Sequence, residues 1–218
     1  MNASHVASLL HQCPIYVILD PSQLLPGASL LQVAEEVLEA GVKVVQLRNK
    51  QDTAREVFEQ ARALTQRCER FGACFILNDR IDLALAAGAH GVHLGPHDVP
   101  IEDARRIAPT LIIGASAGNA RTARALHAAG ADYLGVGALF DARASKADAS
   151  APKGLEVVRQ VRAELGDEVP FVGIGGITSE RTPQVLAAGA DGVAMIRAII
   201  RSEDPGKEVS RCLAALSS

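Results

Sequence analysis

The sequence predicts an α/β fold, a single-domain (β/α)8 TIM barrel over residues 1–218. The prediction depends on a recurring phrase, on apolar runs that alternate with helical segments, and on even spacing. The phrase occurs as "EAGVKVVQL" at 39–47, "AAGAHGVHL" at 86–94, "AAGADYLGV" at 128–136 and "AAGADGVAM" at 187–195. Each copy is the end of a helix, a glycine and a short apolar strand, and glycine suits the left-handed position just past a helix.

Eight apolar runs are predicted to form the strands. Four of them end the repeated phrases, and the other four are residues 15–19, 74–77, 111–115 and 171–174. The runs are continuous rather than alternating, which is typical of parallel strands that are buried on both faces. We therefore expect the strands to lie inside a layer of helices.

Helical segments fill the intervals between the strands. The predicted helices are residues 30–40, 52–70, 119–129, 154–165 and 179–188, and residues 1–14 are expected to form an N-terminal extension or helix. The units average about 27 residues, close to the roughly 30 residues of a βαβ element. A doubly wound open sheet is the competing fold. Even spacing, and the absence of G-x-G-x-x-G after the first strand, favour a closed barrel.

The composition is that of a soluble globular protein with an aliphatic core, since 48% of the residues are hydrophobic and 22% are charged. A net charge of −3 gives no indication of a nucleic-acid or membrane partner. The four cysteines form no C-x-x-C pair, which argues against a zinc site or a redox motif. With no signal peptide and no apolar run long enough for a bilayer, we expect a cytoplasmic location.

Polar residues follow the predicted strands, at the end of the barrel where such folds build their active sites. Gln46, Arg48 and Lys50 follow the second strand, and alternate residues of an extended segment share one side. Two cations and an amide at the mouth of the barrel would suit a polyphosphate group. The alternative is that Arg48 and Lys50 are solvated surface charges.

Carboxylates follow the next two strands. Asn78 and Asp79 come after the third strand and Asp98 after the fourth. Neighbouring strands would bring the two aspartates close enough to bind one Mg²⁺. The alternative is that each aspartate caps the following helix, a position that aspartate favours. His93 faces away from His90 on a strand, so we expect an interior histidine with hydrogen-bond partners rather than a metal ligand.

The remaining strands also end in residues with a chemical role. Ser116 follows the fifth strand, Lys146 the sixth, Gly175 and Gly176 the seventh, and Ile196 and Arg197 the eighth. The glycine pair would expose backbone N–H groups and form a phosphate site with the loop after the eighth strand, although it could be only a turn. Residues 138–153 are the longest stretch without an apolar period. We expect an active-site loop there, mobile without ligand and acting as a lid.

Seven motifs in series resemble the thiamine phosphate synthase family, which also includes a thiazole tautomerase branch. They are "VVQLRNK", "ILND", "GVHLGPHD", "IIGAS", "ADYLGVGALF…SK…APKGL", "GIGGI" and "GADGVAM", from about residue 15 to about residue 200. The resemblance implies a (β/α)8 barrel transferase that joins 4-amino-5-hydroxymethyl-2-methylpyrimidine diphosphate to thiazole phosphate and releases pyrophosphate. It implies Mg²⁺ as the cofactor and phosphorylated small molecules as partners, and it leaves a homo-oligomer open.

The resemblance also implies roles for individual residues. The residues that would hold the pyrimidine diphosphate are Gln46, Arg48, Lys50, Asn78 and Lys146. Asp79 and Asp98 would bind Mg²⁺, and Ser116 would sit beside the pyrimidine. The residues that would bind the thiazole phosphate are Gly175, Gly176, Ile196 and Arg197. Of these, the predicted catalytic groups are Arg48, Lys50, Ser116 and Lys146.

The chain departs from the family pattern in the sixth-strand loop. The usual "GPIFPTxTK" is "GALFDARASK" here, with Ala142 near the first expected threonine and Ser145 near the second, where hydroxyls would contact the thiazole substrate. Arg197 stands where a serine is common. The tautomerase branch resembles the synthase but has a histidine at the position of Gly118 and lacks the metal acids, so the residues here favour the synthase. A tautomerase-like enzyme and a non-catalytic binder of thiamine precursors are the alternatives.

Overall fold

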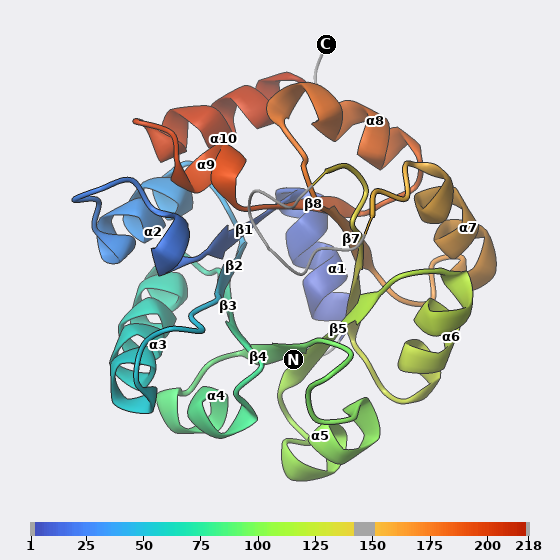
Figure 1. Cartoon of the computed structure of the whole chain (residues 1–218), viewed down its shortest axis with the longest axis horizontal. Helices are drawn as coiled ribbons and strands as arrows, with labels where there is room; N and C mark the ends of the chain where they lie inside the picture. Colours follow the sequence, from blue (N-terminus) through green and yellow to red (C-terminus); the bar gives the residue numbers. More distant parts are fainter. Residues whose placement is uncertain (1–2, 142–150, 217–218) are drawn as a thin grey trace.

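A closed barrel of parallel strands forms the centre of the computed structural model, which describes residues 3–141 and 151–216. The strands are β1 Ile15–Leu19, β2 Val44–Leu47, β3 Cys74–Asn78, β4 Gly91–Leu94, β5 Ile112–Ala117, β6 Tyr133–Gly137, β7 Phe171–Ile174 and β8 Gly192–Met195. Each pairs with its neighbours in sequence, and β1 also pairs with β8 through Val17 and Met195. The predicted barrel is confirmed, and the open sheet is wrong (Figure 1).

Helices form a ring around the barrel (Figure 1). They are α2 Leu30–Glu39, α3 Ala54–Arg70, α4 Ile81–Ala87, α5 Ile101–Ile107, α6 Ala120–Ala128, α7 Glu156–Leu165, α8 Thr182–Ala187, α9 Arg197–Ile200 and α10 Pro205–Ala214, with 3₁₀ turns η1 Pro21–Gln23 and η2 Ser179–Arg181. The helix predicted over 179–188 is thus divided, because η2 precedes α8. No helix in the described parts of the chain is both long and apolar enough to cross a bilayer.

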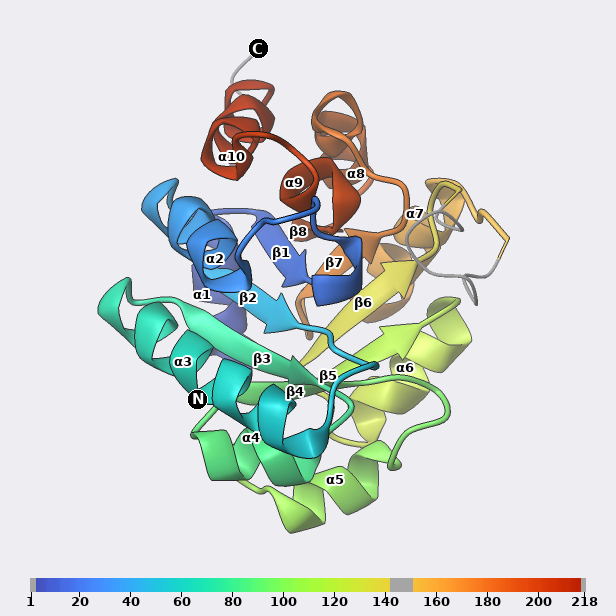
Figure 2. The ribbon, with the colours of Figure 1, turned by 60° about the vertical axis from the view of Figure 1, so that its left-hand side comes forward.

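The first helix, α1 Ala3–Gln12, closes the end of the barrel at which the strands begin. Val6, Leu9 and Leu10 of this helix are buried in one apolar cluster with the barrel interior, including Tyr16 and Tyr133. Figure 1 shows α1 at the centre of the ring, and in Figure 2 the arrows of β2, β3, β5 and β6 run away from it. The opposite end of the barrel is therefore the one available for a site.

Side chains of each strand alternate between the barrel interior and the helix layer. In β1, Tyr16 and Ile18 belong to the inner cluster, whereas Val17 and Leu19 pack in the outer cluster with the helices. Both sets are buried, which explains why the strands read as continuous apolar runs. The interior is tightly filled, since a Cβ atom at Gly114 would overlap the ring of Tyr133.

The repeated phrase carries a structural residue two positions after its glycine. In the third and fourth copies this residue is an aspartate that accepts a hydrogen bond from the start of the preceding strand. Asp132 Oδ2 accepts from Ile113 N at 2.8 Å, and Asp191 Oδ2 accepts from Phe171 N at 2.8 Å. The arginines paired with these carboxylates are Arg105 and Arg162.

The first two copies use other side chains at the same place. His90 Nδ1 accepts a hydrogen bond from Phe75 N at 3.0 Å, and Lys43 Nζ donates to Phe71 O at 2.8 Å. The predicted left-handed glycine is confirmed in all four copies, with φ values of 98°, 69°, 103° and 112° at Gly41, Gly88, Gly130 and Gly189. The side chains of the repeat therefore stabilise the closed end of the barrel. The functional residues are expected at the opposite end.

Candidate active site

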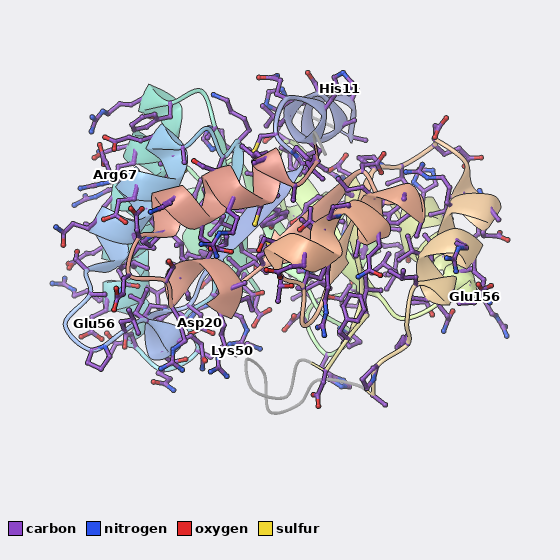
Figure 3. All side chains as sticks on the ribbon, turned by 90° about the horizontal axis from the view of Figure 1, so that it is seen from above. His11, Asp20, Lys50, Glu56, Arg67 and Glu156 are labelled. Carbon is purple, nitrogen blue, oxygen red and sulfur yellow. The ribbon has the colours of Figure 1, made fainter. Side chains whose placement is uncertain are left out.

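Residues that follow the strands gather at the open end of the barrel. Figure 3 shows Asp20 and Lys50 at one end of the molecule and His11, from α1, at the other. Because all strands are parallel, the residues after β2, β3, β4, β7 and β8 reach the same rim. Gln46 lies within β2 rather than after it. Asn78 and Ser116 likewise lie within β3 and β5, because these two strands extend further than predicted.

Two carboxylates and a lysine meet at the ends of β2, β3 and β4. Lys50 Nζ lies 2.9 Å from Asp79 Oδ2. Asp98 Oδ2 accepts a hydrogen bond from Gly95 N at 2.7 Å, and its carboxyl group also contacts that of Asp79. Burial, and then the hydrogen bond with Asp79, raise the pKa of Asp98 above its ordinary value. The structure thus brings the two predicted metal ligands together on one rim.

Neither aspartate caps a helix, so that alternative is wrong. The N-cap residue of α4 is Arg80 and that of α5 is Pro100, and neither makes a side-chain capping hydrogen bond. Asp79 has a left-handed backbone with φ of 64°. Aspartate tolerates this conformation better than most residues, but it still carries strain of about 1–2 kcal/mol. The residue with the strained backbone is thus the one whose carboxylate faces Asp98 and Lys50.

Arg48 is held by an aspartate that the sequence analysis missed. Its Nη1 atom lies 2.6 Å from Oδ2 of Asp20, and only 2% of the surface of Asp20 is exposed. The other oxygen of Asp20 accepts from the backbone N–H and the hydroxyl of Ser22. Arg48 is therefore held in a largely buried ion pair, whereas the side chain of Lys50 is 48% exposed, so the interpretation as a solvated charge stays open for Lys50. Asp20 could have been found, because it directly follows β1 as the other site residues follow their strands.

Gln46 points into the barrel and begins a chain of hydrogen bonds across it. Its Nε2 donates to Tyr16 OH at 2.6 Å, and Tyr16 OH lies 2.8 Å from Tyr133 OH. Tyr133 OH is 3.0 Å from His93 Nδ1, and His93 Nε2 is 3.0 Å from Ser116 Oγ. The interior histidine is confirmed. Gln46 differs from the two cations in its burial, because only 3% of its surface is exposed and its amide bonds Tyr16 inside the barrel.

The two tyrosines in this series of hydrogen bonds are neutral. Burial raises the pKa of Tyr16 and of Tyr133 well above the ordinary value of a phenol. Their hydroxyl groups can therefore donate and accept hydrogen bonds without ionising near neutral pH. The chain fixes the position of the hydroxyl of Ser116, which is exposed at the rim.

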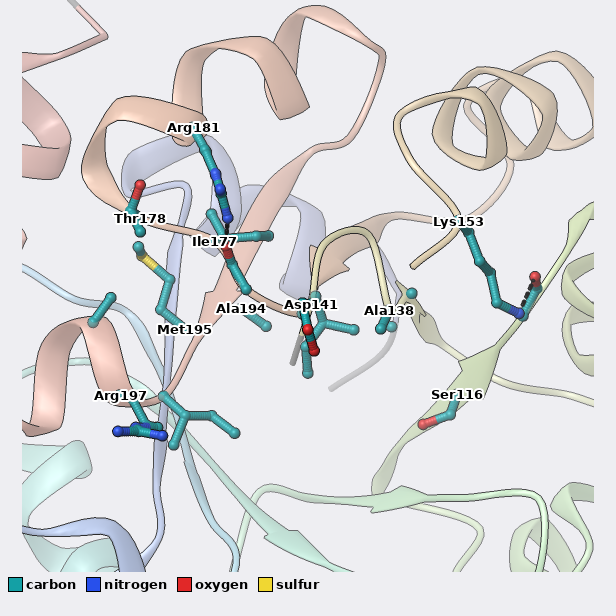
Figure 4. Close-up of a pocket in the computed structure, with 18 of the residues that line it drawn as sticks. Ser116, Ala138, Asp141, Lys153, Ile177, Thr178, Arg181, Ala194, Met195 and Arg197 are labelled. Carbon is teal, nitrogen blue, oxygen red and sulfur yellow. Dashed lines mark hydrogen bonds between the residues drawn. The ribbon is translucent and has the colours of Figure 1, made fainter. Parts of the chain in front are cut away.

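A cavity of about 940 Å³ lies beside the acid pair, over the ends of β5 to β8. Figure 4 shows Ser116 and Lys153 on one wall and Arg197, Met195 and Thr178 on the other. Residues of the predicted phosphate site that line it are Gly175, Gly176, Ile196 and Arg197. Pro96 links the cavity to the loop that carries Asp98. The site thus has an acidic part at β3 and β4 and a larger cavity at β5 to β8.

The glycine pair after β7 packs against the start of the β6 loop. Gly175 and Gly176 have φ of 106° and 62°, which favours glycine. Phe140 N donates to Gly175 O at 3.0 Å. A Cβ atom at Gly176 would lie 2.6 Å from Asp141 O. The pair is therefore more than a turn, because it lets two loops approach each other at the wall of the cavity.

Lys153 is a second residue that the sequence analysis missed. Its Nζ donates to Gly118 O at 2.8 Å and stands where a side chain at position 118 would begin. It lies in the "APKGL" motif and is the last residue of the loop predicted over 138–153. Residues 142–150 of that loop, with Ala142, Ser145 and Lys146, lie outside the described residues.

The acid pair suits a hard cation with few protein ligands. Within residues 3–141 and 151–216, no group of three or more His, Cys, Asp or Glu side chains could hold a metal ion. Two neighbouring carboxylates are nevertheless what Mg²⁺ commonly takes from a protein, with water and substrate phosphate oxygens completing the shell. Asp79 and Asp98 fit such an ion in the presence of a phosphorylated substrate.

Comparisons with known proteins point to one family. A family model described as thiamine monophosphate synthase matches residues 15–199. The thiamine-phosphate synthase of Methanospirillum hungatei JF-1 is 44% identical over 193 residues, covering 88% of this chain and 92% of that protein. That of Moorella thermoacetica is 44% identical over 194 residues, covering 88% and 90%. The solved thiamine phosphate pyrophosphorylase from Pyrococcus furiosus superposes with a TM-score of 0.85 at 37% identity, covering 96% of this chain and 98% of that one.

Proposed function

The chain belongs to the thiamine monophosphate synthase family, and on that premise we propose that it joins the pyrimidine diphosphate to thiazole phosphate and releases pyrophosphate. The observation that carries the proposal is the convergence of Lys50, Asp79 and Asp98 beside a cavity whose wall contains the glycine pair. One part suits a diphosphate leaving group, and the other suits a phosphorylated acceptor. A single closed rim holds both.

The leaving group would lie at the ends of β2 to β4. Arg48 and Lys50 supply positive charge, and Asp79 and Asp98 would hold Mg²⁺ against the diphosphate. The metal would supply charge neutralisation of the phosphate oxygens. Arg48 is kept in place by buried Asp20, so little reorganisation is needed as charge develops on the leaving group.

The bond changes need no protein nucleophile. The carbon–oxygen bond to the diphosphate breaks and its electron pair leaves with the diphosphate. The resulting pyrimidine methylene cation then accepts the lone pair of the thiazole nitrogen, forming the carbon–nitrogen bond. Gln46 and Ser116, at the two ends of the interior hydrogen-bond chain, would orient the pyrimidine. Positioning and electrostatic stabilisation would then provide the catalysis.

The acceptor would occupy the cavity over β5 to β8. Its phosphate would bind at Gly175, Gly176 and the backbone of Ile196 and Arg197, with the guanidinium of Arg197 on the same wall. A guanidinium matches the geometry of phosphate oxygens. As the family resemblance implies, Ser145 of the sixth-strand loop would contact the thiazole substrate, and Lys146 would bind the pyrimidine diphosphate.

The direct test supplies purified protein with both substrates and Mg²⁺ and follows pyrophosphate release. We expect product only when both substrates are present, and loss of activity with a chelator that Mg²⁺ restores. Omission of the thiazole phosphate separates coupling from simple hydrolysis of the diphosphate. Absence of product from a folded protein would refute the proposal.

The two alternative functions, a tautomerase and a non-catalytic binder, predict different experimental results. Metal-independent isomerisation of a thiazole carboxylate phosphate, unaffected by Asp98→Ala, would indicate the tautomerase. Position 118 lacks a side chain and the Nζ of Lys153 fills the space, which disfavours that activity. Binding of both ligands without turnover would indicate a non-catalytic binder.

The cellular location of the protein is also a proposal. The four cysteines are free and buried, which supports a reducing cytoplasm. Assembly into a homo-oligomer stays a prediction.

A further inference from the structure

Arg181 lies where three segments of the site meet. It ends η2, its Nη1 donates to Gly176 O at 2.6 Å, and its Cζ lies 4.5 Å from the centre of the Phe140 ring. The same side chain lines the cavity. Figure 4 shows its guanidinium directed at the turn beside Ile177, with the hydrogen bond drawn as a dashed line.

The two segments that Arg181 contacts are themselves in contact. Leu139 N donates to Ile174 O at 2.8 Å, and Phe140 N donates to Gly175 O at 3.0 Å. Gly176 packs against the β6 loop, because a Cβ atom there would lie 2.9 Å from the Cβ of Phe140. Arg181 therefore covers the junction between the phosphate turn after β7 and the first residues of the loop after β6.

Arginine suits this junction better than lysine. Its planar guanidinium can stack on an aromatic ring and donate hydrogen bonds in its own plane at the same time, whereas an ammonium group is a point charge without a flat face. A hydrogen bond from a charged donor is also stronger than a neutral one. The two contacts together hold Gly176 and Phe140 in one arrangement.

We propose that Arg181 is a positioning residue for the acceptor phosphate, because it ties the Gly176 turn to Phe140 at the start of the β6 loop. The inference rests on the proposed function in taking the cavity as the acceptor site. By fixing the turn before ligand binds, Arg181 lowers the cost of ordering it around a phosphate. The anchored loop start also defines one wall of the space for the acceptor ring.

The chain contains a matched control for this arginine. Arg162 Cζ lies 4.7 Å from the centre of the Phe171 ring, and Arg162 Nε donates to Gly189 O at 2.8 Å. It makes the same two kinds of contact at the closed end of the barrel, away from the cavity. Arg162→Gln therefore removes the same two kinds of contact as Arg181→Gln. It also removes ion pairs with Asp167 and Asp191, so it is a demanding control for loss of stability away from the cavity.

The first experiment needs no turnover. Inorganic phosphate is titrated calorimetrically into the wild type, Arg181→Gln and Arg162→Gln, after thermal unfolding has shown that each is folded. We expect Arg181→Gln to weaken phosphate binding about tenfold and Arg162→Gln to leave it unchanged, the scale of one lost charge-assisted hydrogen bond. Equal affinity of wild type and Arg181→Gln, or a wild type that binds no phosphate, would overturn the proposal.

A second variant separates positioning from direct charge. Phe140→Leu keeps the guanidinium but removes the ring on which it stacks. We expect phosphate binding to weaken roughly threefold, the scale of an exposed cation–π contact. Full affinity in Phe140→Leu would mean that Arg181 acts as a charge alone, which contradicts positioning. Arg181→Lys should not restore binding. If Arg181→Gln does not fold, Phe140→Leu and Arg181→Lys decide the question.

In assays with both substrates, Arg181→Gln should affect the acceptor site and leave the pyrimidine diphosphate site nearly unchanged. We expect Arg181→Gln to raise KM for thiazole phosphate about tenfold while KM for the pyrimidine diphosphate stays within about twofold. A uniform rise in both KM values would overturn the proposal. A folded wild type that makes no product would instead refute the proposed function, and the phosphate titration would still test Arg181.

Discussion

The carboxyl groups of Asp79 and Asp98 lie close enough to affect each other's ionisation, at the ends of the neighbouring strands β3 and β4. Burial raises the pKa of Asp98 and the nearby Asp79 raises it further, while the hydrogen bond from Gly95 N and, to a smaller extent, the charge of Lys50 lower it. Two carboxylates so close repel each other when both are ionised. A bound cation removes that repulsion, which is the physical reason to expect a metal here.

Asp98→Asn should separate activity from stability. The amide oxygen can still accept the hydrogen bond from Gly95 N, while the charge and its repulsion with Asp79 disappear. We expect pyrophosphate release to fall about a hundredfold or more, the scale of losing one charge-stabilising group, with no decrease in Tm. Asp103→Asn, on the exposed side of α5, is the control and should keep full activity. Full activity of Asp98→Asn would contradict the metal proposal.

Substitutions at Asp79 should rank by backbone preference. With φ of 64°, glycine relieves the strain whereas alanine increases it. We expect the free energy of unfolding of Asp79→Gly to exceed that of Asp79→Ala by about 1 kcal/mol. Both variants should lose activity. Denaturant unfolding measures the difference. Equal stability of the two variants would show that the left-handed backbone carries no strain.

Gly176→Ala should damage the acceptor site rather than the fold. The new Cβ would lie 2.6 Å from Asp141 O, so the β6 loop must shift. Gly72→Ala is a matched control, because Gly72 has a similar φ of 59° and no atom within 4 Å of its Cβ position. Both should lose about 1 kcal/mol of stability from the left-handed backbone. Only Gly176→Ala should raise KM for thiazole phosphate. Equal KM values for both variants would contradict a role of the turn in acceptor binding.

His90 should make stability depend on pH. Burial lowers its pKa from the ordinary 6.5, and Nδ1 must stay unprotonated to accept the hydrogen bond from Phe75 N. The unfolded chain therefore takes up the proton at a higher pH than the folded chain. The stability from neutral His90 is complete above 6.5 and decreases as the pH falls below it.

The variant His90→Asn tests this dependence. Its side-chain oxygen can accept the same hydrogen bond but does not titrate. We expect a flatter dependence of the unfolding free energy between about pH 7 and about pH 5 than in the wild type. Parallel curves for the two proteins would show that His90 does not carry the effect.

The sequence by itself determined the order of the strands and which residues reach the open rim. Four glycine-terminated repeats and continuous apolar runs predict consecutive parallel strands, so residues that follow them must share one end. Asp79 and Asp98 could be placed together for this reason. Alternation within a strand likewise placed His93 inside the barrel and His90 outside it. These conclusions depend on periodicity alone, which is a local property of the chain.

Only the tertiary structure decided which partners the side chains meet. Gln46 bonds Tyr16 inside the barrel, Arg48 pairs with Asp20 at the end of the neighbouring strand β1, and Arg181 joins two loops. Such pairs depend on strand register, barrel tilt and rotamers, which bring together residues far apart in the chain. The repeat pattern is the same for all registers, so it leaves these contacts open. Sequence periodicity therefore determined which residues reach the open rim, and packing across the closed barrel determined which partners their side chains contact there.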